Sequence, residues 1–79
     1  MGAARQALTY DDLKSRAHEL AVNDPRTYEE IANELDVSKS AVAQAVTTRG
    51  KKFCRVQIRI VELLSDYEVE EGFILRAKR

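Results

Sequence analysis

Residues 27–46 have the sequence TYEEIANELDVSKSAVAQAV, which contains two helix starts. Thr27 and Glu30 have the spacing of a capping box, in which each side chain bonds the backbone N–H of the other residue. Apolar residues then recur at helical spacing as far as Asp36, and Ser38 is a favourable N-cap for a second helix. The segment predicts two short helices joined by a three-residue turn. The residues predicted to face inward are Tyr28, Ile31, Ala32 and Leu35 in the first helix, and Val42, Ala45 and Val46 in the second.

Two short helices joined in this way form a helix-turn-helix, a unit whose second helix is shaped to enter the major groove of DNA. Individual residues fit that geometry. Ala32 allows the two helices to approach closely, Val37 fills the turn and Val42 anchors the second helix on the first. Asp36 occupies a turn position that usually holds glycine because it requires a positive φ, and aspartate tolerates that conformation better than most residues.

Another helix is predicted ahead of the motif, over residues 10–22. Thr9 and Asp12 have capping-box spacing, and Leu13 begins a run of apolar residues at helical intervals. Asn and Asp beside Pro25 end the helix, because proline disfavours helical geometry in the residue before it.

A chain of 79 residues can build only one small core. We therefore expect a single helix-turn-helix domain over 9–79, with its motif at 27–47. Residues 1–8 are expected to form a flexible N-terminal tail, and 53–75 to form a C-terminal core or dimerisation element.

The charged residues are unevenly distributed, although the net charge is zero. Residues 1–37 carry four basic and eight acidic side chains, a net charge of −4. Residues 38–59 carry six basic side chains and no acidic one, and residues 60–79 carry three basic and five acidic ones. A cationic segment between acidic flanks is typical of a surface that faces a polyanion. A solvated face is the alternative explanation.

The segment 27–46 resembles the helix-turn-helix of the Cro and phage-repressor (XRE-type) regulators, and residues 40–46 are especially similar to a Cro recognition helix. This resemblance implies a sequence-specific double-stranded DNA-binding transcriptional regulator, usually a repressor that acts as a dimer on an inverted repeat. The alternative is a protein-interaction module, such as an antitoxin or adaptor built on a helix-turn-helix core. Affinity of the isolated chain for duplex DNA would distinguish the two.

Residues 53–64, FCRVQIRIVELL, fit two templates. Cys54, Val56, Ile58 and Ile60 alternate with polar residues as in a strand, whereas an apolar stripe that starts at Phe53 fits a helix. The XRE-type resemblance favours the helix, and the Cro resemblance favours a β-hairpin. We expect an all-α fold of four to five short helices, with α+β and a Cro-like C-terminal β-hairpin as the alternative.

Three consecutive apolar residues near the charged C-terminus, Phe73, Ile74 and Leu75, are either the last part of a small core or a dimer surface. We take them as candidates for a homodimer interface.

The candidate DNA contacts fall into two groups. Side chains on the outer face of the second motif helix are expected to contact base edges, because a glutamine can pair bidentately with adenine and a lysine can donate to guanine. Cations and hydroxyls around that helix are expected to bind phosphates. The first group is Ser38, Lys39, Ser40, Gln44 and Thr47, and the second is Thr27, Thr48, Arg49, Lys51, Lys52 and Arg55.

Other classes of function find little support in the sequence. One cysteine, Cys54, and one histidine, His18, cannot form a disulfide or a zinc framework, and no third group is placed to orient them for catalysis. We expect no enzyme activity, metal, cofactor or small-molecule substrate. No apolar run approaches the roughly 20 residues of a membrane span, and no signal peptide is recognisable, so a cytoplasmic location is expected.

Overall fold

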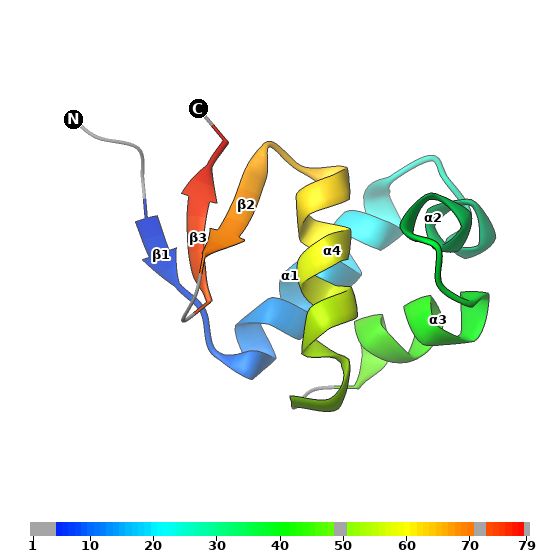
Figure 1. Ribbon diagram of the computed structural model, residues 1–79, viewed down its shortest axis with the longest axis horizontal. Coiled ribbons are helices and arrows are strands. Elements are labelled where there is room, and N and C mark those ends of the chain that lie inside the picture. Colours follow the sequence, from blue (N-terminus) through cyan, green and yellow to red (C-terminus); the bar gives the residue numbers. More distant parts are fainter. Residues whose placement is uncertain (1–4, 49–50, 71–72, 79) are drawn as a thin grey trace.

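The computed structural model describes residues 5–48, 51–70 and 73–78, which form a helical body with a small sheet at one end (Figure 1). Three α-helices, a 3₁₀ turn and a fourth α-helix follow one another along the chain. The helices are α1 (Tyr10–Asn23), α2 (Tyr28–Leu35), α3 (Lys39–Thr47) and α4 (Cys54–Leu64), with a 3₁₀ turn η1 (Lys51–Phe53) before α4. The strands are β1 (Arg5–Ala7), β2 (Tyr67–Glu70) and β3 (Ile74–Ala77).

The sheet makes the fold α+β, so the structure matches the stated alternative instead of the all-α expectation. Its strand order is β1-β3-β2, and both pairings are antiparallel. The hairpin is formed by β2 and β3, downstream of the segment 53–64 for which a hairpin was considered. That segment is helical: Ile60 and Val61 are fully buried among the other helices, and this packing decides between two templates that periodicity alone left equal.

The flexible tail predicted over residues 1–8 is wrong for residues 5–8. Strand β1 pairs with β3, the backbone N–H of Leu8 donates to the Phe73 carbonyl at 2.9 Å, and the Leu8 side chain is buried in the core. The domain therefore begins at least four residues earlier than position 9. Residues 1–4 lie outside the described part of the chain.

The predicted helix starts are confirmed. Thr9 and Asp12 form a complete capping box on α1, and Thr27 and Glu30 form another on α2. The Ser38 hydroxyl accepts a hydrogen bond from the Ala41 N–H at 3.0 Å and so caps α3. Each cap satisfies backbone donors that a helix start leaves without an intrahelical partner.

The turn between α2 and α3 has the geometry that its sequence predicted. Asp36 has φ 58° and ψ 45°, which is the left-handed region, and the Val37 N–H donates to the Ala32 carbonyl at 3.0 Å. These features end α2 abruptly and direct the chain into α3 at once.

Because glycine adopts this conformation without a Cβ penalty, Asp36→Gly is expected to leave stability unchanged or raise it by up to about 1 kcal/mol. Asp36→Val is expected to lower it by more than about 1 kcal/mol, since a β-branched residue fits the left-handed region poorly. Urea denaturation of both variants checks the prediction. Equal stabilities for the two would contradict it.

One continuous core joins the helices to the inner face of the sheet. Helix α1 lies behind α4 and contacts both α3 and α4, while the hairpin packs beside α4 (Figure 1). The side chain of Leu75 belongs to this core, at 3% exposure, and β3 is the central strand. Leu75 is therefore a core residue and not part of a dimer surface. Phe73 and Ile74 are half-buried, and the Phe73 ring makes an edge contact with Tyr10 at a centroid distance of 5.2 Å.

In the described ranges, no helix has the length and apolar content that crossing a membrane would require.

Candidate nucleic-acid interface

Helix α3 lies along one edge of the molecule and presents a polar face to solvent. Val42, Ala45 and Val46 are buried against α1, α2 and α4, as the sequence predicted. In Figure 1, the rest of the molecule lies above and behind α3, and its lower side is open. The five side chains expected to contact bases are all exposed on this helix or at its cap: Ser38, Lys39, Ser40, Gln44 and Thr47.

The N-terminal end of α3 is suited to an anionic partner. Its first turn contains Lys39 and no acidic residue, whereas the first turns of α1 and α2 each contain two acidic residues. Free N–H groups at a helix start carry partial positive charge. Of the two motif helices, α3 is therefore the one whose N-terminal end is electrostatically suited to approach a groove lined by phosphates.

Two hydrogen bonds orient the polar side chains of α3. The Gln44 Nε2 donates to the Ser40 hydroxyl oxygen at 2.9 Å, and the Thr47 hydroxyl donates to the Ala43 carbonyl at 2.8 Å. An amide NH₂ has two hydrogens, so the bond to Ser40 leaves one hydrogen and the carbonyl oxygen of Gln44 for a partner. This is the donor–acceptor pair that bidentate contact with an adenine requires.

The cationic segment follows α3 directly. Thr48, Lys52 and Arg55 are exposed, and η1 lies at the same lower edge of the molecule as the C-terminal end of α3 (Figure 1). The Lys52 ammonium is 5.5 Å from the centroid of the Phe53 ring, a cation–π contact. Arg49 lies outside the described residues, and only the backbone of Lys51 is described.

Thr27 is less available to a phosphate than the sequence suggested. Its backbone N–H donates to the Glu30 carboxylate at 2.8 Å, and its hydroxyl accepts from the Glu30 N–H at 3.1 Å. Only the hydroxyl hydrogen remains as a donor, beside the exposed carboxylates of Glu29 and Glu30. The start of α2 therefore contributes less to anion binding than α3 and the segment after it.

Gln57 is a buried residue beside the candidate interface that the sequence analysis did not identify. Its side chain is fully buried, and its Nε2 donates to the Ala45 carbonyl at 2.8 Å and to the Thr48 carbonyl at 2.9 Å. These bonds tie the last turn of α3 to α4. The signal was present in the sequence, because position 57 is four residues after Phe53 and three before Ile60, which places it on the apolar stripe of the helical template.

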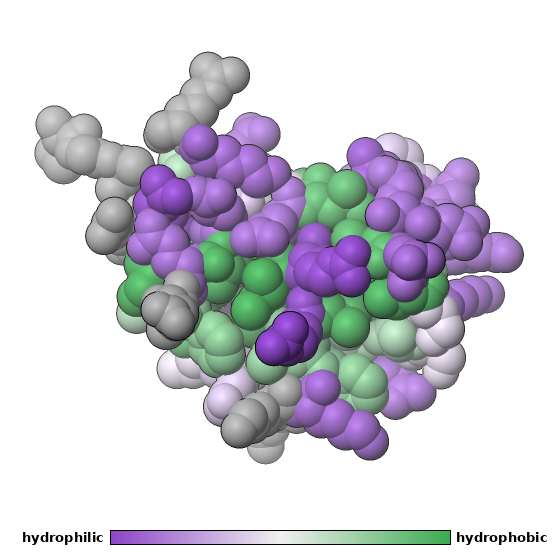
Figure 2. Space-filling view, viewed as in Figure 1, coloured by the Kyte–Doolittle hydropathy of each residue, from purple (hydrophilic) through white to green (hydrophobic). Residues whose placement is uncertain are grey.

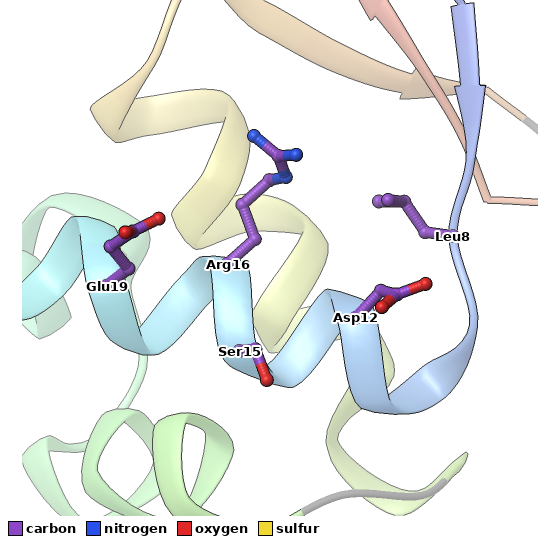
Figure 3. Close-up of a pocket in the computed structure, with 5 residues that line it drawn as sticks. All are labelled: Leu8, Asp12, Ser15, Arg16 and Glu19. Atoms are coloured by element: carbon purple, nitrogen blue, oxygen red, sulfur yellow. The ribbon is translucent and has the colours of Figure 1, made fainter.

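A shallow pocket of about 280 Å³ is lined by residues of α1 and by Leu8 ahead of it. Figure 3 shows Leu8 and Arg16 directed toward the same space between α1 and the sheet. The Asp12 carboxylate beside it accepts the Thr9 N–H in the capping box. Among the described residues, no group of three or more His, Cys, Asp and Glu side chains is placed to hold a metal ion. The exposed face of α3 remains the strongest candidate site.

Comparison of the chain with protein-family models, with curated proteins and with solved structures found no match.

Proposed function

We propose that this protein is a sequence-specific double-stranded DNA-binding transcriptional regulator, a repressor that acts as a homodimer on an inverted repeat. The observation that carries the proposal is the polar, acid-free outer face of α3, presented by a capped α2, a left-handed turn at Asp36 and a buried Val42. A helix held in this way by its partner helix can enter a major groove while its apolar side stays in the core. The resemblance of residues 27–46 to Cro and XRE-type regulators supports the same function.

The proposed contacts divide by chemistry. Gln44 pairs with an adenine and Lys39 donates to a guanine, while the Ser38, Ser40 and Thr47 hydroxyls complete the base contacts. Lys51, Lys52 and Arg55 bind phosphates beside the groove that α3 occupies, with Arg49, Thr48 and Thr27 as further phosphate ligands. These backbone contacts set the register of the helix and supply most of the affinity for DNA of any sequence.

Selection from a pool of randomised duplex DNA tests the function directly. We expect enrichment of an inverted repeat whose half-site centres are about 34 Å apart, which is one helical turn. A variant with both Lys39→Ala and Gln44→Ala serves as the control and is expected to enrich nothing above background. If the unmodified chain also enriches nothing, the proposal is overturned.

The phosphate contacts predict a change in salt dependence. Lys52→Gln is expected to reduce the slope of log affinity against log salt by about 0.9 per protomer, and to weaken all sequences about equally. Arg16→Gln also removes one positive charge, but Arg16 lies on α1 and is directed toward the sheet (Figure 3). The salt slope of this variant is therefore expected to equal that of the unmodified chain. Fluorescence anisotropy titrations at several salt concentrations measure both slopes. Equal slopes for the two variants would remove Lys52 from the phosphate contacts.

A further inference from the structure

A groove of about 550 Å³ is lined by residues of α4 and of the β2–β3 hairpin. Figure 2 shows apolar surface over both elements on this face of the molecule, interrupted by hydrophilic side chains. Contiguous apolar surface that stays exposed on a small domain marks an interaction site. The apolar side chains that line the groove are Cys54, Val56 and Ile58 of α4, and Val69 and Phe73 of the hairpin.

The groove is open to solvent, because each of these five side chains is only half-buried. Sites for small molecules enclose most of the surface of their ligand, which an open groove does not do. A groove between a helix and a hairpin instead matches the apolar face of a helix from another chain.

Two arginines of α4 give the groove positive charge. Arg55 and Arg59 line it, are exposed, and pair with no acidic side chain in the part of the chain that the structure describes. Glu62, the only acidic residue of α4, is engaged elsewhere, since its carboxylate accepts a hydrogen bond from the Val69 N–H at 3.0 Å. Both guanidinium groups therefore remain available to a partner.

The hairpin side of the groove offers no free carboxylate among the described lining residues. Glu70 is the one acidic side chain there, and it is half-buried and ion-paired with Arg76. A guanidinium group that a partner covers has to be paired, because an unpaired buried charge is costly. A partner that covers this groove therefore has to bring negative charge.

Side chains, and not strand pairing, make the contact with such a partner. Strand β2 is an edge of the sheet, but the Val69 N–H on its free edge already donates to the Glu62 carboxylate. A strand added to β2 would need that donor. The groove therefore accepts a helix more readily than an extended segment.

We propose that the groove binds an acidic amphipathic helix of another protein, with apolar side chains between α4 and the hairpin and carboxylates against Arg55 and Arg59. The two arginines are four residues apart, which is about 6 Å along α4 at a rise of about 1.5 Å per residue. Carboxylates at positions i and i+4 of a helix that lies along α4 have the same separation. Each carboxylate can form the bidentate pair that arginine favours.

Arg55 connects the groove with DNA binding, and here the inference rests on the proposed function, in which Arg55 binds a phosphate. A guanidinium group that turns toward a carboxylate in the groove is withdrawn from the phosphates. The carboxylates of the bound helix also repel the DNA backbone. The acidic helix therefore competes with DNA, which makes the groove a regulatory site of the proposed regulator.

Selection of displayed random peptides of about 15 residues, or four helical turns, on the full chain without DNA tests the proposal. We expect the enriched peptides to combine apolar residues at helical spacing with acidic residues four positions apart. Ile58→Glu is expected to weaken their binding at least about tenfold. Val22→Glu is the matched control and should bind like the unmodified chain, because Val22 is 57% exposed at the end of α1. No enrichment, enrichment of peptides without acidic residues, or equal binding by both variants would overturn the proposal.

A charge exchange tests the arginine contacts on an exposed residue that does not threaten the fold. Arg59 is outside the proposed DNA contacts, and Arg59→Glu is expected to weaken binding of a selected peptide at least about tenfold. Replacing the acidic residues of that peptide one at a time by lysine should identify one position that restores binding to Arg59→Glu and weakens binding to the unmodified chain. Failure of every lysine to restore binding would overturn the proposed pairing.

The thiol of Cys54 reports where the peptide binds, since it lines the groove and is the only cysteine of the sequence. The selected peptide is expected to slow its alkylation by a maleimide in the unmodified chain and to leave it fast in Ile58→Glu. Protection that arises without peptide, as the concentration of the chain alone is raised, would assign the groove to a second copy and overturn the proposal.

The regulatory role is tested by adding the selected peptide to the complex of the chain with its selected DNA. Saturating peptide is expected to weaken DNA binding at least about tenfold, and to have no effect on the DNA affinity of Arg59→Glu. Unchanged DNA affinity in the unmodified chain would overturn the competition at Arg55. The two proposals fail differently: a chain that binds the peptide in the groove and yet enriches no DNA overturns the regulator function and leaves the helix site standing.

Discussion

Gln57→Glu is expected to lower the free energy of unfolding by about 3 kcal/mol or more, although it only replaces the side-chain amide by a carboxylate of nearly equal size. The Gln57 amide donates two hydrogen bonds to the carbonyls of Ala45 and Thr48 in a position with no solvent exposure. A carboxylate cannot donate, so the substitution sets a buried negative charge against two carbonyl oxygens. Urea denaturation measures the loss.

Gln44→Glu is the matched control, because it makes the same chemical change on an exposed side chain of α3. Its effect on stability is expected to stay within about 0.5 kcal/mol. Similar losses for the two variants would show that the buried amide does not hold α3 as the geometry indicates.

The Gln57→Glu variant should also acquire a pH dependence that the unmodified chain lacks at this position. Burial and the facing carbonyls raise the pKa of the introduced carboxyl above its value in the unfolded chain. The folded state therefore binds more protons than the unfolded state in the interval between the two pKa values, and the variant loses stability as the pH rises through that interval. Its deficit relative to the unmodified chain is expected to shrink when unfolding is repeated at pH 5 instead of pH 7.

The first three helices could be predicted because their signals are local. The capping boxes at Thr9 and Thr27 and the cap at Ser38 each involve residues three apart, and the apolar stripes repeat every turn. Asp36 is a comparable case, since a short polar side chain at a position that usually holds glycine indicates a left-handed turn. Nothing distant in the chain is needed to recognise any of these features.

The sheet could not be predicted in the same way because it depends on distant partners. Strand β1 is only three residues long, and it exists through its pairing with β3 near the other end of the chain. Three apolar residues at 73–75 gave no alternation from which a strand could be identified. Leu75 becomes a core residue because β3 is the central strand, a fact that only the assembled sheet provides.

More of the exposed surface of α3 could be predicted from the sequence than of the buried structure that supports it. The exposed residues of α3 follow from the helical period once Ser38 is taken as the cap. Gln57 was missed because the helical stripe over 53–64 was identified from its apolar residues alone. The groove beside α4 was missed because it joins α4 to a hairpin that periodicity did not predict.

Gln44→Ala is expected to cost about 1 to 3 kcal/mol of binding free energy on the selected DNA site and to relax the preference at one base position. The Ser40 hydroxyl already holds the Gln44 amide in one orientation, so little side-chain freedom is lost when the amide meets a base. Ser40→Ala removes that restraint without removing the amide, and we expect it to cause a smaller loss of affinity at the same base position. Anisotropy titrations against the selected site and its single-base variants measure both effects.

Random duplex DNA provides the control for the Gln44 prediction, because affinity for it depends on phosphate contacts that Gln44 does not make. Gln44→Ala should therefore bind random DNA almost as tightly as the unmodified chain, whereas Lys52→Gln should bind both kinds of DNA more weakly. An equal loss on selected and random DNA would take Gln44 out of the base contacts. Gln44 and Lys52 lie on consecutive elements of one exposed edge. A sequence-dependent loss for Gln44→Ala beside a uniform loss for Lys52→Gln would therefore show that α3 enters the DNA groove. A surface that only attracts the DNA backbone by its positive charge would lose affinity uniformly in both variants.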